Sequence, residues 1–240
     1  MHLENKIAIV TGASSGIGIE FSKKLVSRGA VVYGLARRLS KLQEVREQIG
    51  NKFIPVQMDI TKPEDISNWA LSTFQDDHLP HILINNAGLG YFGNVEDMSV
   101  DDWNTMVNTN LNGVFYLTRK VVPLMKKNDN HCHIINIASV AGLLGNPQIS
   151  GYNATKFGLR GFSEALFKEL RYHDIKVSTM FPGSIDTHFF DTAGGSGTHA
   201  NMLQASDVAD TLLYLLETPD NFLINEITLR PLNPKNPDDL

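Results

Sequence analysis

Tyr152 and Lys156 are four residues apart in the stretch Tyr-Asn-Ala-Thr-Lys. On a helix this spacing places the phenol and the ammonium on one face. A free phenol titrates near ~10, and a neighbouring cation favours its ionised form. We therefore expect Lys156 to lower the pKa of Tyr152 toward working pH, where the phenol can exchange a proton with a substrate.

A glycine-rich turn near the start of the chain could supply the second reagent. The stretch Thr-Gly-Ala-Ser-Ser-Gly-Ile-Gly at 11–18 follows a strand pattern and precedes a helix pattern. Gly12, Gly16 and Gly18 would let the backbone approach a pyrophosphate, which the free N–H groups and dipole of the helix N-terminus stabilise. Three glycines can also form no more than a tight turn, but the flanking strand and helix favour a dinucleotide site.

The end of the second strand pattern indicates which dinucleotide fits. It reads Leu-Ala-Arg-Arg and contains no carboxylate for a ribose 2′-hydroxyl. Arg37 and Arg38 can instead make bidentate contacts to a 2′-phosphate, and Ser14 could add a hydroxyl donor. A solvated pair of arginines at a helix start is the alternative. The pattern favours NADP(H).

Two further strand ends carry polar residues. Asp59 could accept from an adenine amino group or cap the helix that follows. Asn85-Asn86-Ala87-Gly88 ends the fourth strand pattern, where small residues would let a cofactor lie against the sheet and amides could bridge adjacent strands. By itself this tetrad could also be a turn.

Strand and helix patterns alternate along the whole chain, which predicts an α/β fold. We expect one domain over 1–240, a doubly wound, Rossmann-like parallel sheet of seven strands with helices on both faces. Expected strands are 6–11, 30–36, 53–58, 81–85, 132–138, 175–181 and 224–229; expected helices are 16–28, 39–49, 63–76, 100–127, 151–172 and 206–217. A glycine-rich stretch within 187–205 predicts a mobile substrate loop, and the proline-rich 231–240 an extended or disordered tail.

Composition excludes several classes of partner. The net charge is −5, and the sequence contains no Lys/Arg-rich run. Both features argue against nucleic acid or an anionic membrane as the partner. No apolar run reaches the roughly 18 residues of a membrane span, and a strand pattern begins at Lys6, so we expect a cytoplasmic protein with a small-molecule partner. His131 and His133 could face one side of a strand, but no third ligand is evident, so we expect no metal.

Together these motifs resemble the short-chain dehydrogenase/reductase family, in its single-domain form of about 250 residues. The resemblance covers about residues 5 to 230 and rests on six motifs in order. They are Thr-Gly-x-x-x-Gly-x-Gly at 11–18, Asn-Asn-Ala-Gly at 85–88, Asn110, Ser139, Tyr-x-x-x-Lys at 152–156, and Pro182-Gly183 with Thr187.

The resemblance implies specific roles. Tyr152 would be the general acid in carbonyl reduction, Ser139 would bind the substrate oxygen, Lys156 would lower the Tyr152 pKa and hold the nicotinamide ribose, and Asn110 would anchor a water for proton supply. The implied cofactor site comprises Gly12, Ser14, Ser15, Gly16, Ile17, Gly18, Arg37, Arg38, Asp59, Asn86, Ala87, Gly88, Tyr152, Lys156, Pro182, Gly183, Ile185 and Thr187. Many NADP-preferring relatives carry a basic residue at position 15, where this chain has serine.

The resemblance also places the substrate among the loops after Gly88, Ser139 and Gly183. Candidate contacts are Ser139, Tyr152, Leu144, Gln148, His188 and Phe189. The lining is mainly apolar and carries no Lys or Arg, so we expect a neutral or modestly polar ketone, aldehyde or secondary alcohol. The alternatives are a 3-hydroxy acid dehydrogenase of the same family and a non-catalytic nucleotide sensor or scaffold.

Members of the family are often tetramers, so we expect a homo-oligomer, either a tetramer or a dimer. The helix pattern at 151–172 carries apolar residues that could serve subunit contacts or pack on the sheet. They are Phe157, Phe162, Leu166, Phe167 and Leu170.

Overall fold

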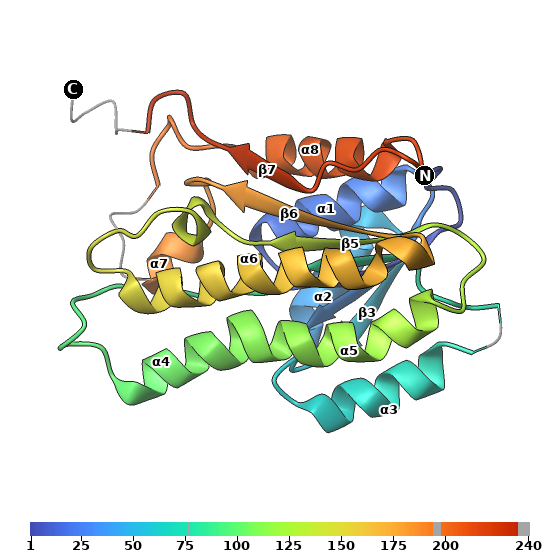
Figure 1. Cartoon of the computed structure of the whole chain (residues 1–240), viewed down its shortest axis with the longest axis horizontal. Helices are drawn as coiled ribbons and strands as arrows, with labels where there is room; N and C mark the ends of the chain where they lie inside the picture. Colours follow the sequence, from blue (N-terminus) through green and yellow to red (C-terminus); the bar gives the residue numbers. More distant parts are fainter. Residues whose placement is uncertain (76, 194–197, 235–240) are drawn as a thin grey trace.

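All seven predicted strands are present and form one parallel sheet in the order β3-β2-β1-β4-β5-β6-β7. The computed structural model describes residues 1–75, 77–193 and 198–234 (Figure 1). The strands are β1 (Ile7–Thr11), β2 (Val31–Ala36), β3 (Phe53–Gln57), β4 (Ile82–Asn85), β5 (Cys132–Ile137), β6 (Ile175–Pro182) and β7 (Glu226–Leu229). The α/β, Rossmann-like fold expected from the sequence is confirmed.

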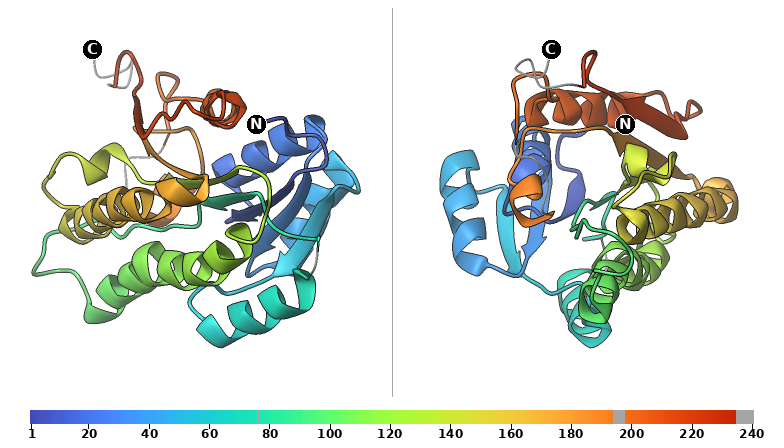
Figure 2. Two further views of the ribbon diagram at one scale, coloured as in Figure 1. Left: turned by 45° about the vertical axis from the view of Figure 1, so that its right-hand side comes forward. Right: turned by 90° about the vertical axis from the view of Figure 1, so that its left-hand side faces the viewer.

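Helices cover both faces of this sheet (Figure 2). They are α1 (Gly16–Ser27), α2 (Leu39–Ile49), α3 (Pro63–Thr73), α4 (Val100–Val107), α5 (Gly113–Met125), α6 (Ser150–Leu170), α7 (Phe189–Ala193) and α8 (Ala205–Glu217). One apolar cluster joins the sheet to α1, α2 and α8, and a second joins the opposite face to α3, α5 and α6. Alternate residues of the buried strands therefore serve two cores.

The chain reverses its direction across the sheet between β1 and β4. β1 pairs with β2 on one side and with β4 on the other, so Ile9 lies between Tyr33 and Leu83. In parallel α/β sheets a crevice opens at such a reversal, beyond the carboxyl ends of the strands. The turn into α1 and the loops after β4, β5 and β6 all begin at this edge, where α7 and the start of α6 also lie (Figure 1).

The helix expected over 100–127 is interrupted. It consists of α4, a π-helical turn at Asn108–Asn112 and α5. The apolar pattern of the sequence nevertheless reads as one helix, because a π turn inserts only about one extra residue into the helical hydrogen-bond pattern. Asn110, in the middle of the turn, is buried and bonds to two other segments, which explains why the regular helix gives way there.

The described parts of the segment 187–205 contain regular structure. Helix α7 occupies Phe189–Ala193, and a parallel bridge pairs Ile185 with Leu203. Ala193 is buried, and its carbonyl accepts from Phe92 N–H at 3.0 Å. The mobility expected for the loop stays a prediction. Residues 194–197, and 235–240 of the tail, lie outside the described residues. Within the described part of the chain, no helix is long and apolar enough to cross a membrane.

Candidate active site

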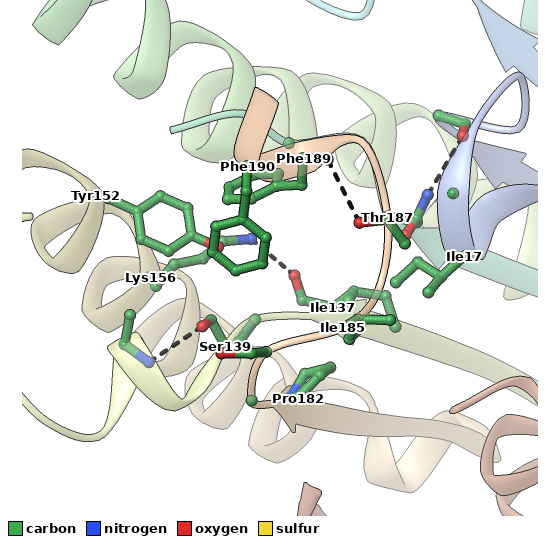
Figure 3. A pocket seen from close by; sticks show the side chains of 18 of the residues that line it. Ile17, Ile137, Ser139, Tyr152, Lys156, Pro182, Ile185, Thr187, Phe189 and Phe190 are labelled. Atoms are coloured by element: carbon green, nitrogen blue, oxygen red, sulfur yellow. Dashed lines mark hydrogen bonds between the residues drawn. The ribbon is translucent and has the colours of Figure 1, made fainter. Parts of the chain in front are cut away.

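A cavity of about 600 Å³ lies at the carboxyl edge of the sheet. It extends from the glycine-rich turn before α1 to the first turns of α6 and to α7 (Figure 3). Of the predicted residues, its lining includes Gly12, Ser15, Gly16, Ile17, Arg38, Asn86, Ala87, Gly88, Ser139, Tyr152, Lys156, Pro182, Gly183, Ile185, Thr187, His188 and Phe189. Residues widely separated in sequence thus meet in one cavity.

The glycine-rich turn has the geometry that an anion site requires. Gly12 and Gly16 have positive φ angles of 66° and 53°, which favour glycine. A Cβ on Gly12 would come within 2.9 Å of Asn86 Nδ2, and one on Gly18 within 2.2 Å of the Gly12 carbonyl oxygen. Ser15 precedes α1 without a side-chain cap, so the first N–H groups of α1 remain available for a pyrophosphate.

Thr11 fastens this turn to the neighbouring strand. Its hydroxyl accepts from the N–H groups of Asn86 and Ala87, both at 2.9 Å, and Asn86 Nδ2 donates to the Thr11 carbonyl at 2.9 Å. The ends of β1 and β4 are thereby held together beneath the cavity. The sequence motif included Thr11, but the role of its hydroxyl depends on a partner 75 residues away.

Tyr152 and Lys156 both face the cavity from α6 and are buried (Figure 3). Burial raises the pKa of Tyr152 to about 12, although a side-chain hydrogen bond with Ser139 acts in the opposite direction. The net shift of the Tyr152 pKa is therefore upward, and Lys156 is not among the groups that lower it. Lys156 Nζ donates to the Ile137 carbonyl at 3.0 Å and lies 5.6 Å from the Tyr152 ring centroid.

Burial also acts on Lys156, whose pKa it lowers to about 8. An ammonium taken out of water favours its neutral form, and one carbonyl does not replace its hydration. Lys156 is therefore mostly charged at neutral pH but gives up a proton much more readily than an exposed lysine. This makes it suitable for supplying protons to an adjacent hydroxyl.

Asn110 is fully engaged by protein groups. Its Oδ1 accepts from Leu89 N–H at 3.0 Å, while Nδ2 donates to the Leu89 carbonyl at 2.8 Å and to Thr155 Oγ1 at 3.0 Å. Thr155 in turn donates to the Tyr152 carbonyl at 2.9 Å. Asn110 thus joins the loop after β4 to the Tyr152 helix. Its proposed water-binding role stays a prediction, and the contribution of Thr155 was missed because nothing local to its motif indicates it.

Ser139 lies at the end of β5 and precedes a short 3₁₀ turn at Val140–Gly142. Its Oγ accepts from Ala141 N–H at 3.1 Å, and the hydroxyl is close enough to Tyr152 to act on the pKa of that phenol. Two hydroxyl groups, from the segment after β5 and from α6, therefore line the same end of the cavity. This pair can bind one carbonyl oxygen from the substrate.

Aromatic rings surround Tyr152 on the substrate side. The Tyr152 ring centroid is 5.9 Å from that of Phe92 and 5.7 Å from that of Phe189, and Phe190 packs edge-on against Phe189 (Figure 3). All four rings line the cavity. Phe92 was not among the expected substrate contacts, although its proximity to Gly88 in the sequence was a signal.

Two predicted substrate contacts lie elsewhere. Leu144 and Gln148 are exposed and are not among the residues that line the cavity. Gln148 has a positive φ of 64°, and its carbonyl accepts from Gly93 N–H at 2.7 Å. Its backbone therefore connects two loops near the cavity, while its side chain is exposed to solvent.

Four predicted cofactor residues also lie outside this lining: Ser14, Gly18, Arg37 and Asp59. Arg37 and Asp59 line a separate, shallower cavity beside the ends of β2 and β3. Asp59 Oδ1 accepts from the N–H and the hydroxyl of Thr61 at 3.0 and 2.8 Å, so one oxygen serves the turn before α3. Gly18 contributes by close packing beneath the turn rather than by facing the cavity.

Comparison with known proteins identifies the family. The sequence profile of the short chain dehydrogenase family matches residues 6–194, which is more than half of the chain. The chain therefore belongs to the short-chain dehydrogenase family and is an oxidoreductase of that family. This agrees with the resemblance found in its motifs.

Individual relatives cover almost the whole chain. An uncharacterised oxidoreductase of Staphylococcus epidermidis is 33% identical over 96% of this chain and 99% of its own. The closed form of a serine dehydrogenase complexed with NADP⁺ is 32% identical, with a TM-score of 0.86 over 93% of this chain and 94% of that chain. A 3-ketoacyl-(acyl-carrier-protein) reductase from Brucella melitensis complexed with NADH is 28% identical, with a TM-score of 0.88 over 97% and 100%. A nicotinamide cofactor is thus common to these structural neighbours.

Proposed function

We propose that the protein transfers a hydride between NADP(H) and a small to medium, mostly apolar ketone, aldehyde or secondary alcohol, with Tyr152 as general acid and base. The observation that carries this proposal is the joint placement of Ser139, Tyr152 and Lys156 at the inner end of a cavity. Its other end lies at the N-terminus of α1 and at Arg38.

A bound NADPH would supply the hydride for carbonyl reduction. Ser139 and Tyr152 donate hydrogen bonds to the substrate oxygen, where negative charge develops as the carbonyl is reduced. Tyr152 then gives its proton to that oxygen, and the same group removes the proton in alcohol oxidation. Lys156, with its pKa near 8, restores the proton on Tyr152.

The residues at the turn before α1 fit a pyrophosphate, because the glycines leave room, Gly16 and Ile17 line the cavity, and no side chain caps the first N–H groups of α1. Arg38 supports the preference for the 2′-phosphorylated form, since its guanidinium matches phosphate geometry and it lines the cavity. Thr187 would help to hold the carboxamide end. It lies over the turn, with its Cγ2 3.5 Å from the Cβ position of Gly16.

The substrate end supports a neutral carbonyl compound. Apart from Lys156 and Arg38, which serve the reaction and the cofactor, the lining contains no Lys or Arg, and Phe92, Phe189 and Phe190 offer apolar surface. A substrate carboxylate buried there would have no guanidinium or free ammonium partner. A 3-hydroxy acid is the second candidate, and the similarity to a serine dehydrogenase favours it.

We also infer assembly as a homotetramer or dimer, in which α6 takes part. Leu166 and Leu170 are buried against the sheet, but Phe157 is 43% exposed on the same helix. Aromatic residues are enriched at subunit interfaces, so the exposed ring of Phe157 supports such a contact. Light scattering of the purified protein, with Phe157→Glu for comparison, tests this assignment; a monomeric wild-type protein contradicts it.

A spectrophotometric panel tests the function. NADPH or NADH is mixed with apolar ketones, aldehydes and 3-oxo acids, and oxidation is followed at constant enzyme concentration. We expect turnover of apolar carbonyl compounds with NADPH preferred. Faster turnover of 3-oxo acids would favour the second candidate, a preference for NADH would contradict the role of the arginines, and no turnover at all would favour a nucleotide sensor.

A further inference from the structure

We propose that Asn153 is a positioning residue, which fixes the Ser139 loop against the Tyr152 helix and so sets the separation of the two catalytic hydroxyls. Here the Ser139 loop means residues 139–146, between β5 and α6. The inference rests on the proposed function, because it concerns the Ser139 and Tyr152 pair. Asn153 directly follows Tyr152 but does not line the cavity.

The side-chain amide of Asn153 bonds to three separate backbone groups of this loop. Nδ2 donates to the Ala141 carbonyl at 2.6 Å and to the Leu144 carbonyl at 2.7 Å, and Oδ1 accepts from Asn146 N–H at 3.2 Å. Both amide hydrogens and the oxygen are thus engaged, and only 7% of the residue is exposed. Serine or alanine could not make all three bonds.

A glycine provides the second contact between loop and helix. The Cβ position of Gly142 lies 2.8 Å from the Lys156 carbonyl oxygen and 3.0 Å from its carbonyl carbon. Only a residue without a side chain permits this approach. Since 153 and 156 are one helical turn apart, the loop is held against the same face of α6 at two successive turns.

Ser139 is connected to Asn153 through a single residue. Ala141 donates its N–H to Ser139 Oγ at 3.1 Å, and its carbonyl accepts from Asn153. On the other side, Ala138 N–H donates to the Met180 carbonyl at 2.8 Å and so fixes the end of β5. The Ser139 hydroxyl is therefore anchored to the sheet before it and to α6 after it.

The same loop presents Asn146 to the cavity, with its backbone held by Asn153. Loss of the Asn153 amide therefore releases one catalytic hydroxyl and part of the substrate lining together. It leaves the glycine-rich turn and Arg38 untouched. Catalysis should suffer while cofactor binding does not.

The test compares Asn153→Ala, Asn153→Ser and the wild-type chain. A matched control is Asn128→Ala, because Asn128 also bridges backbone groups of a loop, accepting from Asn130 N–H and donating to the Pro80 carbonyl, but near the opposite edge of the sheet. For Asn153→Ala we expect kcat/KM for the carbonyl substrate to fall about 10–100-fold. The Kd for NADPH should change less than about threefold, and the serine variant should be intermediate.

A double-mutant cycle separates positioning from general loss of structure. If Asn153 acts through Ser139, adding Asn153→Ala to Ser139→Ala should cost less than about threefold further. An effect as large as in the wild-type background would overturn the proposal. So would wild-type-like kcat/KM in Asn153→Ala, or a matching loss in the Asn128→Ala control.

Amide hydrogen exchange on the cofactor-free protein supplies a readout that needs no turnover. Asn153→Ala should raise exchange at least about tenfold in residues 140–146 and leave the second half of α6 unchanged. Unchanged exchange in this loop would overturn the inference even if the wild-type protein is active. Conversely, faster exchange in a protein that reduces no carbonyl would refute the proposed function while showing that the loop contact is real.

Discussion

The two ends of the cavity are built in opposite ways. At the inner end, Tyr152 and Lys156 are buried, and Lys156 already bonds to a backbone carbonyl. At the outer end, Arg38 is exposed, and among the described residues it has no ion-pair partner. The catalytic groups at the inner end are thus buried and already hydrogen-bonded, whereas the guanidinium at the outer end is exposed to solvent.

This difference indicates which physical quantity each end controls. Fixed, water-excluded groups act on developing charge without reorganisation, so the inner end should determine kcat. Exposed guanidinium groups attract a phosphate across solvent that screens them, so the outer end should affect KM for the cofactor and respond to salt. Variants at each end test whether kcat and KM for the cofactor are controlled separately in this way.

The largest effect is expected for Tyr152→Phe. Removal of the hydroxyl takes away the proton donor and the partner of Ser139, so kcat should fall about 10³-fold or more. The Kd for NADPH, measured by fluorescence titration, should stay within about threefold. Turnover within tenfold of the wild type would contradict the assignment of Tyr152 as general acid.

The second prediction concerns the loss of folding stability caused by burying the charged Lys156 at the inner end. The pKa of Lys156 is about 8 in the folded chain and near the ordinary 10.5 after unfolding, so the unfolded state binds more protons between these values. The free energy of unfolding should therefore rise as the pH increases from about 8 to 10.5. Lys156→Met should lack this rise and be more stable than the wild type at pH 7 by about 2 kcal/mol, while losing activity.

Urea unfolding at pH 7 and pH 10 measures both values. The stabilisation should shrink at pH 10, where the wild-type lysine is largely neutral in the folded chain. The exposed Lys168, paired with Glu164 on the same helix, provides the control, and Lys168→Met should show little pH-dependent difference. Equal stabilisation of Lys156→Met at both pH values would argue against the depressed lysine pKa.

The sequence predicted the features that depend on local spacing and missed those that depend on distant partners. The seven strands, the glycine turn and the Tyr152 and Lys156 pair depend on local spacing, and the strands were predicted with ends within two residues. The π turn at Asn110, the role of Thr155 and helix α7 were not, because each depends on a hydrogen bond to a distant segment. The local pattern of residue types does not show which distant segment a side chain will bond to.

Leu144 and Gln148 show a further limit. The family spacing placed both in the substrate region, yet the left-handed backbone at Gln148 and the docking of the loop by Asn153 leave their side chains outside the lining. Periodicity gives the direction of side chains within helices and strands, but loops have no such period. Predicted contacts that lie on loops therefore need the structure.

The third prediction tests the outer end. Arg38→Ala should raise KM for NADPH about tenfold and leave kcat and KM for NADH nearly unchanged, since only the phosphorylated cofactor offers a partner for the guanidinium. The wild-type preference for NADPH should also weaken as salt increases, and the variant should lose this dependence. Equal changes with both cofactors would mean that Arg38 shapes the turn rather than selecting the phosphate.

The smallest effect is expected for Arg37→Ala. This variant tests whether the two adjacent arginines contribute differently to cofactor binding. Arg38 lines the main cavity, whereas Arg37 lines the shallower one together with Asp59. We therefore expect Arg37→Ala to raise KM for NADPH only about threefold, through long-range attraction rather than direct contact. This residual effect should vanish in about 0.5 M salt. If Arg37→Ala raises KM for NADPH more than Arg38→Ala does, the phosphate lies toward the second cavity. The cofactor site would then extend beyond Arg38 toward Arg37 and Asp59.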